Sequence, residues 1–264
     1  MRYCFILAGS EDRAYLLKRS IDCMRENRLY SDADIYLYWQ GSKDKIPYVS
    51  RYTGIICADT LQGVFLPRYE LFKKFGIMYD YTILIDDDLF MYPDTTYANS
   101  IAFLKANDDN GVCILGRQCH KRRNEFRMIN YATENYNVEG GMVFPRKCVE
   151  LIVSYLADRS ADVTEDIFWI LLYCKGFDLY RDFSSNVIHT CHRPAEDGSV
   201  SGYYKWRLEK PHVPLLPEYT VSKLVKDEFG DRMRYKVPEC RDVNRAGMQE
   251  RIKCREEMFK NGKT

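Results

Sequence analysis

The sequence has almost no net charge and no long apolar run. Its 39 basic and 38 acidic side chains leave a formal charge of +1 at pH 7. No overall field therefore draws the chain to nucleic acid or to an anionic membrane. No apolar segment is long enough to span a bilayer, and the first residues, MRYCFILAGS, have the wrong length and flanks for a secretory signal. We expect a chain without a transmembrane segment.

The ten cysteines include no C-x-x-C pair. This spacing argues against a zinc ribbon and against a thioredoxin-like redox site. Most of the cysteines lie in apolar runs, where a thiol packs as a small hydrophobic group. The pattern favours a reducing, cytoplasmic location over a disulfide framework.

The chain is long enough for one large domain with an extension. Of its 264 residues, 46% are hydrophobic and 14% aromatic, so it can bury a sizeable core. After residue 202 the composition shifts: prolines recur, and basic residues outnumber acidic ones. We predict a main domain over residues 1–202 and a C-terminal extension over 203–264, with a helix at about 245–260, packed on the main domain.

The first half of the sequence alternates strand-like and helix-like segments. Strands are expected at 2–8, 34–39, 53–58, 81–85 and 111–116, and helices at about 10–27, 67–79 and from 94 or 95 to 105. Ser10 is placed as an N-cap, and Asp94 or Thr95 as another. This alternation predicts an α/β fold with a mostly parallel central sheet flanked by helices. Ligands of such sheets bind beyond the carboxyl ends of the strands.

The second half is less regular. VEGGMVFP predicts a strand, followed by a helix over 146–156 and a second helix from Thr164 to about Tyr173. Two short strands are expected at 177–181 and 187–189.

Three consecutive aspartates follow a buried strand in the segment YTILIDDDLFMYPD, residues 81–94. If the chain stays extended, Asp86 and Asp88 point to one side and Asp87 to the other. Two carboxylates on one side suit a hard divalent cation such as Mg²⁺ or Mn²⁺. The alternative is a solvated acidic loop without a ligand.

ILIDDDLFMYP resembles the D-x-D segment of metal-dependent glycosyltransferases with the GT-A fold, and VEGGMVFP followed by VTED resembles the inverting family 2 type. The resemblance covers residues 2–193 and implies a Rossmann-like GT-A fold. It implies that Mn²⁺ or Mg²⁺, held by Asp86 and Asp88, neutralises the departing nucleoside diphosphate of a nucleotide-sugar, expected to be a UDP-sugar. Asp166 is then the general base, with Glu165 second. YYKWR does not match the Q-x-x-R-W motif of processive members, so processive polymerisation is not expected.

The resemblance also suggests a late metal ligand and a set of donor contacts. His189 is preferred over His192 as the ligand, although a strand-end histidine is equally often structural. The expected donor-binding residues are Ala8, Gly9, Ser10, Arg13, Asp59, Arg68, Asp87, Gly140, Gly141 and Arg193. The two adjacent glycines equally suit a tight bend in a core strand, and TED taken alone favours simple complementation of a helix dipole.

The acceptor is left open as a glycan, a lipid-linked acceptor or a nucleic acid. The segment GRQCHKRRNEFR is strongly basic and suits either a solvated loop or an acceptor surface; its basic residues are Arg117, Lys121, Arg122, Arg123 and Arg127. Such a surface also allows a glycosyltransferase acting on a modified nucleic-acid base. A sugar-phosphate nucleotidyltransferase is less favoured, because LAGSEDR lacks the glycines of a triphosphate-binding loop. A non-catalytic carbohydrate- or nucleic-acid-binding protein is the remaining alternative.

Overall fold

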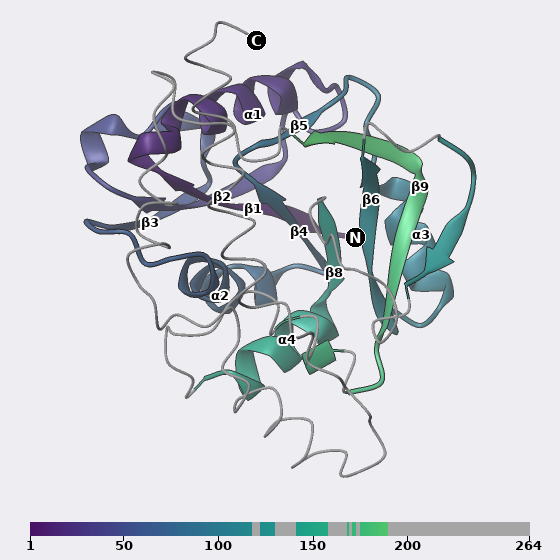
Figure 1. Cartoon of the computed structure of the whole chain (residues 1–264). Coiled ribbons are helices and arrows are strands. Elements are labelled where there is room, and N and C mark those ends of the chain that lie inside the picture. Colours follow the sequence, from purple (N-terminus) through teal and green to yellow (C-terminus); the bar gives the residue numbers. More distant parts are fainter. Residues whose placement is uncertain (118–121, 130–140, 158–167, 169–170, 173–174, 190–264) are drawn as a thin grey trace, which may run out of the picture.

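The computed structural model describes residues 1–117, 122–129, 141–157, 168, 171, 172 and 175–189. In this part of the chain a nine-stranded sheet has the order β3-β2-β1-β4-β8-β6-β9-β5, with β7 paired to β9 (Figure 1). The strands are β1 Tyr3–Ser10, β2 Asp34–Gln40, β3 Gly54–Ala58, β4 Tyr81–Asp86, β5 Leu89–Met91, β6 Gly111–Arg117, β7 Phe126–Met128, β8 Met142–Pro145 and β9 Asp178–His189.

Six strands run in one direction and three run against them. The strands β1, β2, β3 and β4 pair in parallel, and β6 pairs in parallel with β9. The strand β8 lies antiparallel to both β4 and β6 and so joins the two parallel groups, while β5 and β7 run antiparallel to β9. The predicted mostly parallel sheet is confirmed.

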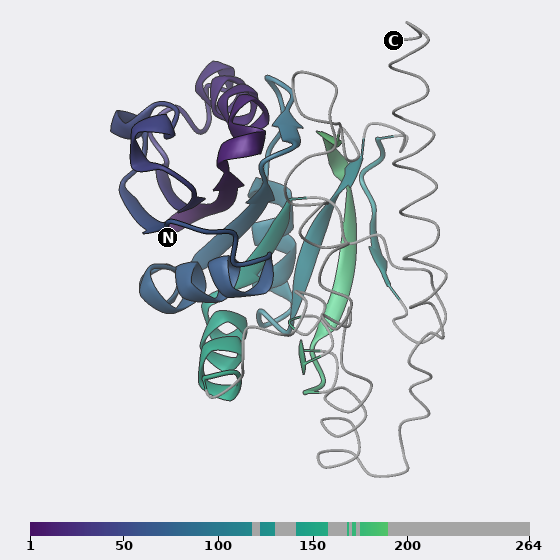
Figure 2. The ribbon, with the colours of Figure 1, turned by 60° about the vertical axis from the view of Figure 1, so that its left-hand side comes forward.

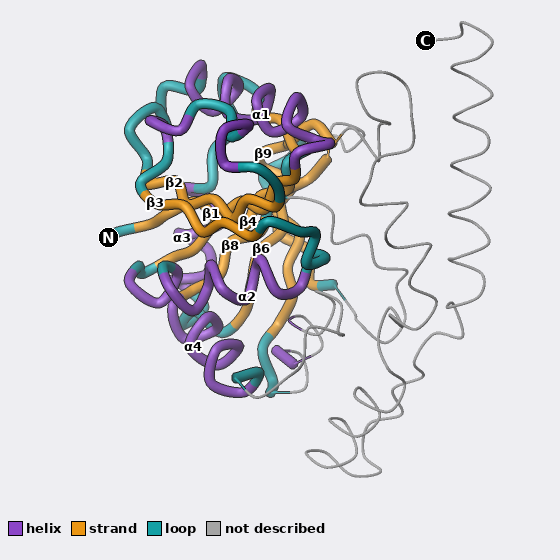
Figure 3. Tube along the Cα trace, turned by 90° about the vertical axis from the view of Figure 1, so that its left-hand side faces the viewer, coloured by secondary structure: helices purple, strands orange, loops and turns teal. Residues whose placement is uncertain are grey.

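Helices cover both faces of the sheet, as predicted. They are α1 Ala14–Glu26, α2 Phe65–Lys74, α3 Ala98–Ala106 and α4 Arg146–Tyr155. Figure 3 shows α1 on one face and α2 with α4 on the other. The short 3-10 turns are η1 Glu11–Arg13, η2 Lys43–Lys45, η3 Val49–Arg51 and η4 Gly76–Met78.

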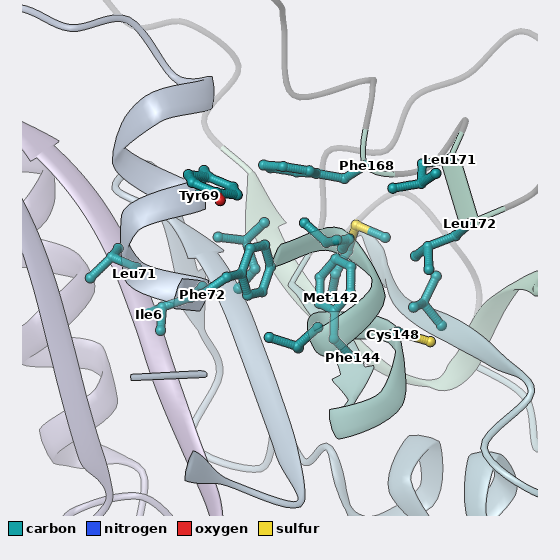
Figure 4. Packing of buried hydrophobic residues seen from close by; sticks show 14 of the residues in the cluster. Ile6, Tyr69, Leu71, Phe72, Met142, Phe144, Cys148, Phe168, Leu171 and Leu172 are labelled. Atoms are coloured by element: carbon teal, nitrogen blue, oxygen red, sulfur yellow. The ribbon is translucent and has the colours of Figure 1, made fainter. Parts of the chain in front are cut away.

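Alternating strand residues supply two separate cores, because successive side chains point to opposite faces. On β1, Phe5 and Leu7 join the core under α1 and α3, whereas Cys4 and Ile6 join the core under α2 and α4. In the second core, Phe72 of α2 packs edge-on against Phe144 of β8 and Phe168 (Figure 4). A sheet buried on both faces explains why its strands read as nearly continuous apolar runs.

The third helix begins later than the sequence predicts. α3 starts at Ala98, not at residue 94 or 95, and neither Asp94 nor Thr95 caps it. The Thr95 hydroxyl accepts the Tyr92 N–H at 2.8 Å and donates to the Asn186 carbonyl at 2.7 Å. Residues 92–95 are therefore held as a turn against β9.

The two predicted C-terminal strands are a single strand, β9. Its pairing with β6 shifts between Leu115↔Asp182 and Gly116↔Asn186, which leaves residues 183–185 as a bulge. The buried Asp182 carboxylate accepts bonds from the Ser100 hydroxyl at 2.5 Å and from the Ser184 N–H at 2.7 Å. These bonds stabilise the bulge, which lies where the sequence predicts a gap between two separate strands.

Most of the remaining expected elements of the described part agree with the structure to within a few residues, but α1 begins only at Ala14 and α2 already ends at Lys74 rather than near residue 79. β5 and β7, three residues each, were not predicted. Phe168, Leu171 and Leu172 are helical and fall within the range expected for the helix from Thr164 to about Tyr173, whose other residues lie outside the described ones. The extension predicted over 203–264 lies outside the described residues. Among those residues, no helix has the length and apolar character needed to cross a bilayer. Figure 2 shows the same ribbon from a second side.

Candidate donor-binding site

The carboxyl ends of β1 and β4 lie side by side in the middle of the sheet. In the parallel register, Ala8 of β1 is the direct partner of Asp86 of β4. Gly9 and Ser10, which follow Ala8, pair with the last two residues of β2. The fold thus brings the predicted nucleoside-binding segment next to the first aspartate, at the edge where open α/β sheets bind ligands.

The chain turns immediately after Asp86. β4 ends there, Asp87 and Asp88 form the turn, and β5 begins at Leu89. The Ser20 hydroxyl on α1 donates to the Leu89 carbonyl at 2.8 Å, and Leu89 pairs with His189 in the antiparallel register of β5 and β9. The turn is therefore fixed from two sides, and the backbone of His189 lies next to the aspartates. The side chain of His189 lies outside the described residues.

The three aspartates do not alternate in direction as an extended chain would require. Arg13 Nη2 on η1 lies 2.8 Å from Asp87 Oδ1 and 3.0 Å from Asp88 Oδ2. Asp86 instead forms a close ion pair with Arg68 of α2. The prediction that Asp86 and Asp88 face one side, with Asp87 facing away, is wrong, because the turn places Asp87 and Asp88 around one cation.

The triplet is largely buried, which makes its charge balance important. Asp87 is 5% exposed and Asp88 is 3% exposed. Burial raises the pKa of Asp87 to about 7; the nearby Asp88, Asp86 and Asp12 raise it too, and Arg13 opposes them. Buried carboxylates are tolerated only with a close positive partner, and Arg13 supplies one here.

Asp12 is a site residue that the sequence interpretation did not select. Its carboxylate accepts the Ser10 hydroxyl at 2.6 Å and contributes to the raised pKa of Asp87. The sequence placed Ser10 as a helix cap, but Ser10 makes no capping bond to the backbone. The sequence feature that indicates Asp12 as a site residue is its position, two residues after β1 and directly before Arg13.

The carboxylate oxygens of the triplet are suitable ligands for a hard divalent cation. Carboxylate oxygens are the ligands that Mg²⁺ and Mn²⁺ prefer, and one or two of them suffice when a substrate phosphate completes the shell. The Arg13 guanidinium shows that Asp87 and Asp88 already gather around one positive charge. Among the side chains that the structure describes, no group of three or more histidine, cysteine or acidic residues is arranged to hold a metal ion.

Two of the predicted donor-binding glycines have packing reasons of their own. A Cβ on Gly141 would lie 2.1 Å from the Tyr97 hydroxyl, and a Cβ on Gly9 would lie 2.8 Å from a methyl group of Leu17. Gly141 directly precedes Met142, whose partner in β4 is Leu84, so it lies close to the aspartate end of that strand. A donor contact at either glycine stays a prediction.

Asp59 and Arg68 occupy different parts of this edge. Arg68 is 7% exposed and touches the triplet directly. Asp59 follows β3 and is exposed. Because β3 is three strands from β4, Asp59 is roughly 14 Å from the triplet at the usual strand spacing. Arg68 therefore belongs to the aspartate cluster, and Asp59 does not.

The basic segment is partly neutralised within the chain. Arg122 pairs with Asp94 at 3.1 Å and lies over the Tyr92 ring, and Arg123 pairs with Glu125 at 2.7 Å. These pairs leave less free positive charge than the sequence suggested. Lys121 and the side chain of Arg117 lie outside the described residues, as do the predicted site residues Gly140, Glu165, Asp166 and Arg193.

Comparison with solved structures shows the fold. The S. aureus protein TarS matches 96% of this chain with a TM-score of 0.54 and 11% identity. A TarS 1–349 structure in complex with UDP-GlcNAc matches 98% of this chain and 73% of its own, again with a TM-score of 0.54 and 11% identity. A further TarS 1–349 structure gives a TM-score of 0.53. The expected Rossmann-like, GT-A-like fold is confirmed.

The chain spans about half of the full TarS chain, 49% of its length. No protein-family model matches the sequence, and no curated protein matches it. At this level of identity the likeness describes the fold alone.

Proposed function

We propose that the protein is a glycosyltransferase that takes a sugar from a UDP-sugar donor and passes it to an acceptor hydroxyl by single displacement. The observation that carries the proposal is the pairing of Ala8 with Asp86, which brings the loop after β1 beside three aspartates at one carboxyl edge. That edge is where this class of sheet binds nucleotides. The fold shared with TarS, which was solved with UDP-GlcNAc, supports the donor class.

Within this proposal, different residues at the carboxyl edge of the sheet bind different parts of the donor. The segment Ala8–Ser10 flanks the nucleoside, and Asp87 and Asp88 hold Mg²⁺ or Mn²⁺, together with Asp86 and His189. The metal supplies positive charge to the departing diphosphate. Arg13 and Arg68 pair with the same aspartates and so lie close to that charge, and guanidinium groups bind phosphate well. Asp166, with Glu165 as the second candidate, takes the acceptor proton.

The test is slow hydrolysis of a panel of nucleotide-sugars by the purified protein. We expect release of UDP from one UDP-sugar in Mn²⁺ or Mg²⁺, and no release after chelation. Replacing both Asp87 and Asp88 with asparagine should lower turnover by about 100-fold or more. Asp80→Asn, at the opposite end of β4 and paired with Arg146, is the matched control and should keep its activity. Turnover that is undiminished by chelator would remove the metal from the proposal.

The same assay separates the alternatives. A nucleotidyltransferase would instead consume UTP and a sugar phosphate and release pyrophosphate. A binding protein without activity would bind UDP but leave every donor intact. Transfer to a modified nucleic-acid base would require DNA or RNA binding at low salt, and the pairing of Arg122 and Arg123 with carboxylates makes this outcome less favoured.

A further inference from the structure

Two arginines from different elements form ion pairs with the aspartate triplet. Arg13 comes from η1, directly after β1, and Arg68 comes from α2. The side chain of Arg13 is 13% exposed, and those of Asp87 and Asp88 are 7% and 5% exposed. One guanidinium nitrogen thus lies within 3.0 Å of oxygens from two neighbouring carboxylates.

We infer that Arg13 acts as a built-in counter-cation for Asp87 and Asp88. A divalent metal must displace Arg13 from these two carboxylates, and the freed guanidinium then binds the diphosphate of the donor. The inference rests on the proposed function, because it assigns the metal and the diphosphate to this edge. It makes Arg13 a positioning residue that couples the binding of the metal to the binding of the nucleotide.

The physical reason is competition between two positive charges for the same oxygens. A guanidinium and a divalent cation repel each other strongly in a site with little water, so both cannot stay on this pair of carboxylates. Without metal, Arg13 offsets the cost of burying two like charges side by side. Metal alone must then break the two ion pairs that Arg13 makes with these carboxylates.

A nucleoside diphosphate removes that penalty. Its phosphate oxygens accept the parallel N–H groups that a guanidinium presents, so Arg13 exchanges carboxylate partners for phosphate partners. The metal and the nucleotide then each favour the binding of the other, because linkage between two sites is reciprocal.

The test is titration of Mn²⁺ into the whole chain, with and without UDP, followed by calorimetry or by the electron paramagnetic resonance signal of free Mn²⁺. In the wild type we expect weak binding of Mn²⁺ alone and binding at least about tenfold tighter with UDP. Arg13→Gln should bind Mn²⁺ alone about tenfold more tightly than the wild type, with a smaller effect of UDP. A general loss of structure cannot produce this gain in affinity.

Arg146→Gln is the matched control, because Arg146 pairs with Asp80 at 2.9 Å at the other end of β4. It should bind Mn²⁺ as the wild type does. An Arg13→Gln affinity equal to or weaker than that of the wild type overturns the inference. If Arg13→Gln does not fold without metal, refolding in Mn²⁺ should restore it, and failure of Mn²⁺ to do so also overturns the inference.

The outcomes distinguish this inference from the proposed function. A wild type that neither binds UDP nor hydrolyses any UDP-sugar refutes the proposed function, whatever Mn²⁺ does alone. A wild type that hydrolyses a UDP-sugar while Arg13→Gln gains no affinity for Mn²⁺ refutes only the role of Arg13.

Discussion

The Tyr97 hydroxyl lies against the backbone of Gly141, where an added Cβ would approach its oxygen to 2.1 Å. Tyr97 is fully buried at the start of α3, and its N–H donates to the Tyr30 hydroxyl at 2.7 Å. Its own hydroxyl has no hydrogen-bond partner within the described part of the chain. The contact joins α3 to the start of β8, next to the aspartate edge.

Gly141→Ala should therefore destabilise the protein. The clash involves a side chain anchored in an aromatic cluster with Phe5 and Tyr30, so the ring cannot move away freely. Overpacking of this kind costs about 1–3 kcal/mol. Urea denaturation followed by circular dichroism measures the change in the free energy of unfolding.

A variant of Tyr97 tests whether its direct contact with residue 141 causes the loss of stability. Tyr97→Phe removes the atom that clashes and also a buried hydroxyl, so alone it should be neutral or stabilising by about 1 kcal/mol. Combined with Gly141→Ala it should recover part of the lost stability, since the ring carbon Cζ still lies 3.0 Å from the new Cβ. Strictly additive effects of the two substitutions would contradict a direct contact.

Asp182 should be the most sensitive polar residue of β9. It is fully buried and accepts bonds from the Ser100 hydroxyl and from the N–H and hydroxyl of Ser184. Asp182→Ala leaves the buried Ser100 hydroxyl without this acceptor and should cost about 3 kcal/mol. Ser184→Ala removes a single donor and should cost about 1 kcal/mol in the same urea titration. Equal costs for the two variants would show that Asp182 does not organise the bulge.

The cysteines of the described part should differ sharply in reactivity. Cys4, Cys113 and Cys148 are fully buried, and burial raises the pKa of the Cys4 thiol to about 12 and those of the other two as well. Cys57 is only half-buried. Because the thiolate is the reactive form, the buried three should be alkylated at least about 100-fold more slowly than Cys57 in the native protein. Peptide mass spectrometry after timed iodoacetamide labelling gives the rates, and labelling in urea, where all should react alike, is the control.

The sequence predicted the parts of the fold that rest on local patterns. The strands ending at Ala58 and Asp86 and the helix from Arg146 were visible because apolar spacing and flanking residues agree there. β5 and β7 were missed because three residues are too few to show a period, and their pairing with β9 is a long-range contact. The sequence predicts a gap between two strands at the bulge of residues 183–185, because the shifted pairing with β6 is likewise a long-range feature.

The candidate site shows the same division between local and long-range information. That the aspartates lie at a strand end could be predicted, but their directions could not, because the turn after Asp86 depends on contacts from α1 and β9. The sequence placed Arg13 and Arg68 near the donor. It did not show that they already pair with the triplet, since those ion pairs join residues 18 to 75 positions apart.

The last prediction concerns the proposed general base. Asp166→Asn keeps the size of the side chain but cannot take a proton, so it should bind the UDP-sugar with unchanged affinity while turnover falls by about 100-fold to 10,000-fold. Glu165→Gln, the neighbouring carboxylate, is the matched control and should lose much less. Donor affinity from calorimetry and UDP release from the active UDP-sugar separate binding from chemistry. Full activity of Asp166→Asn would exclude it as the base, and loss confined to Glu165→Gln would transfer the role to that residue.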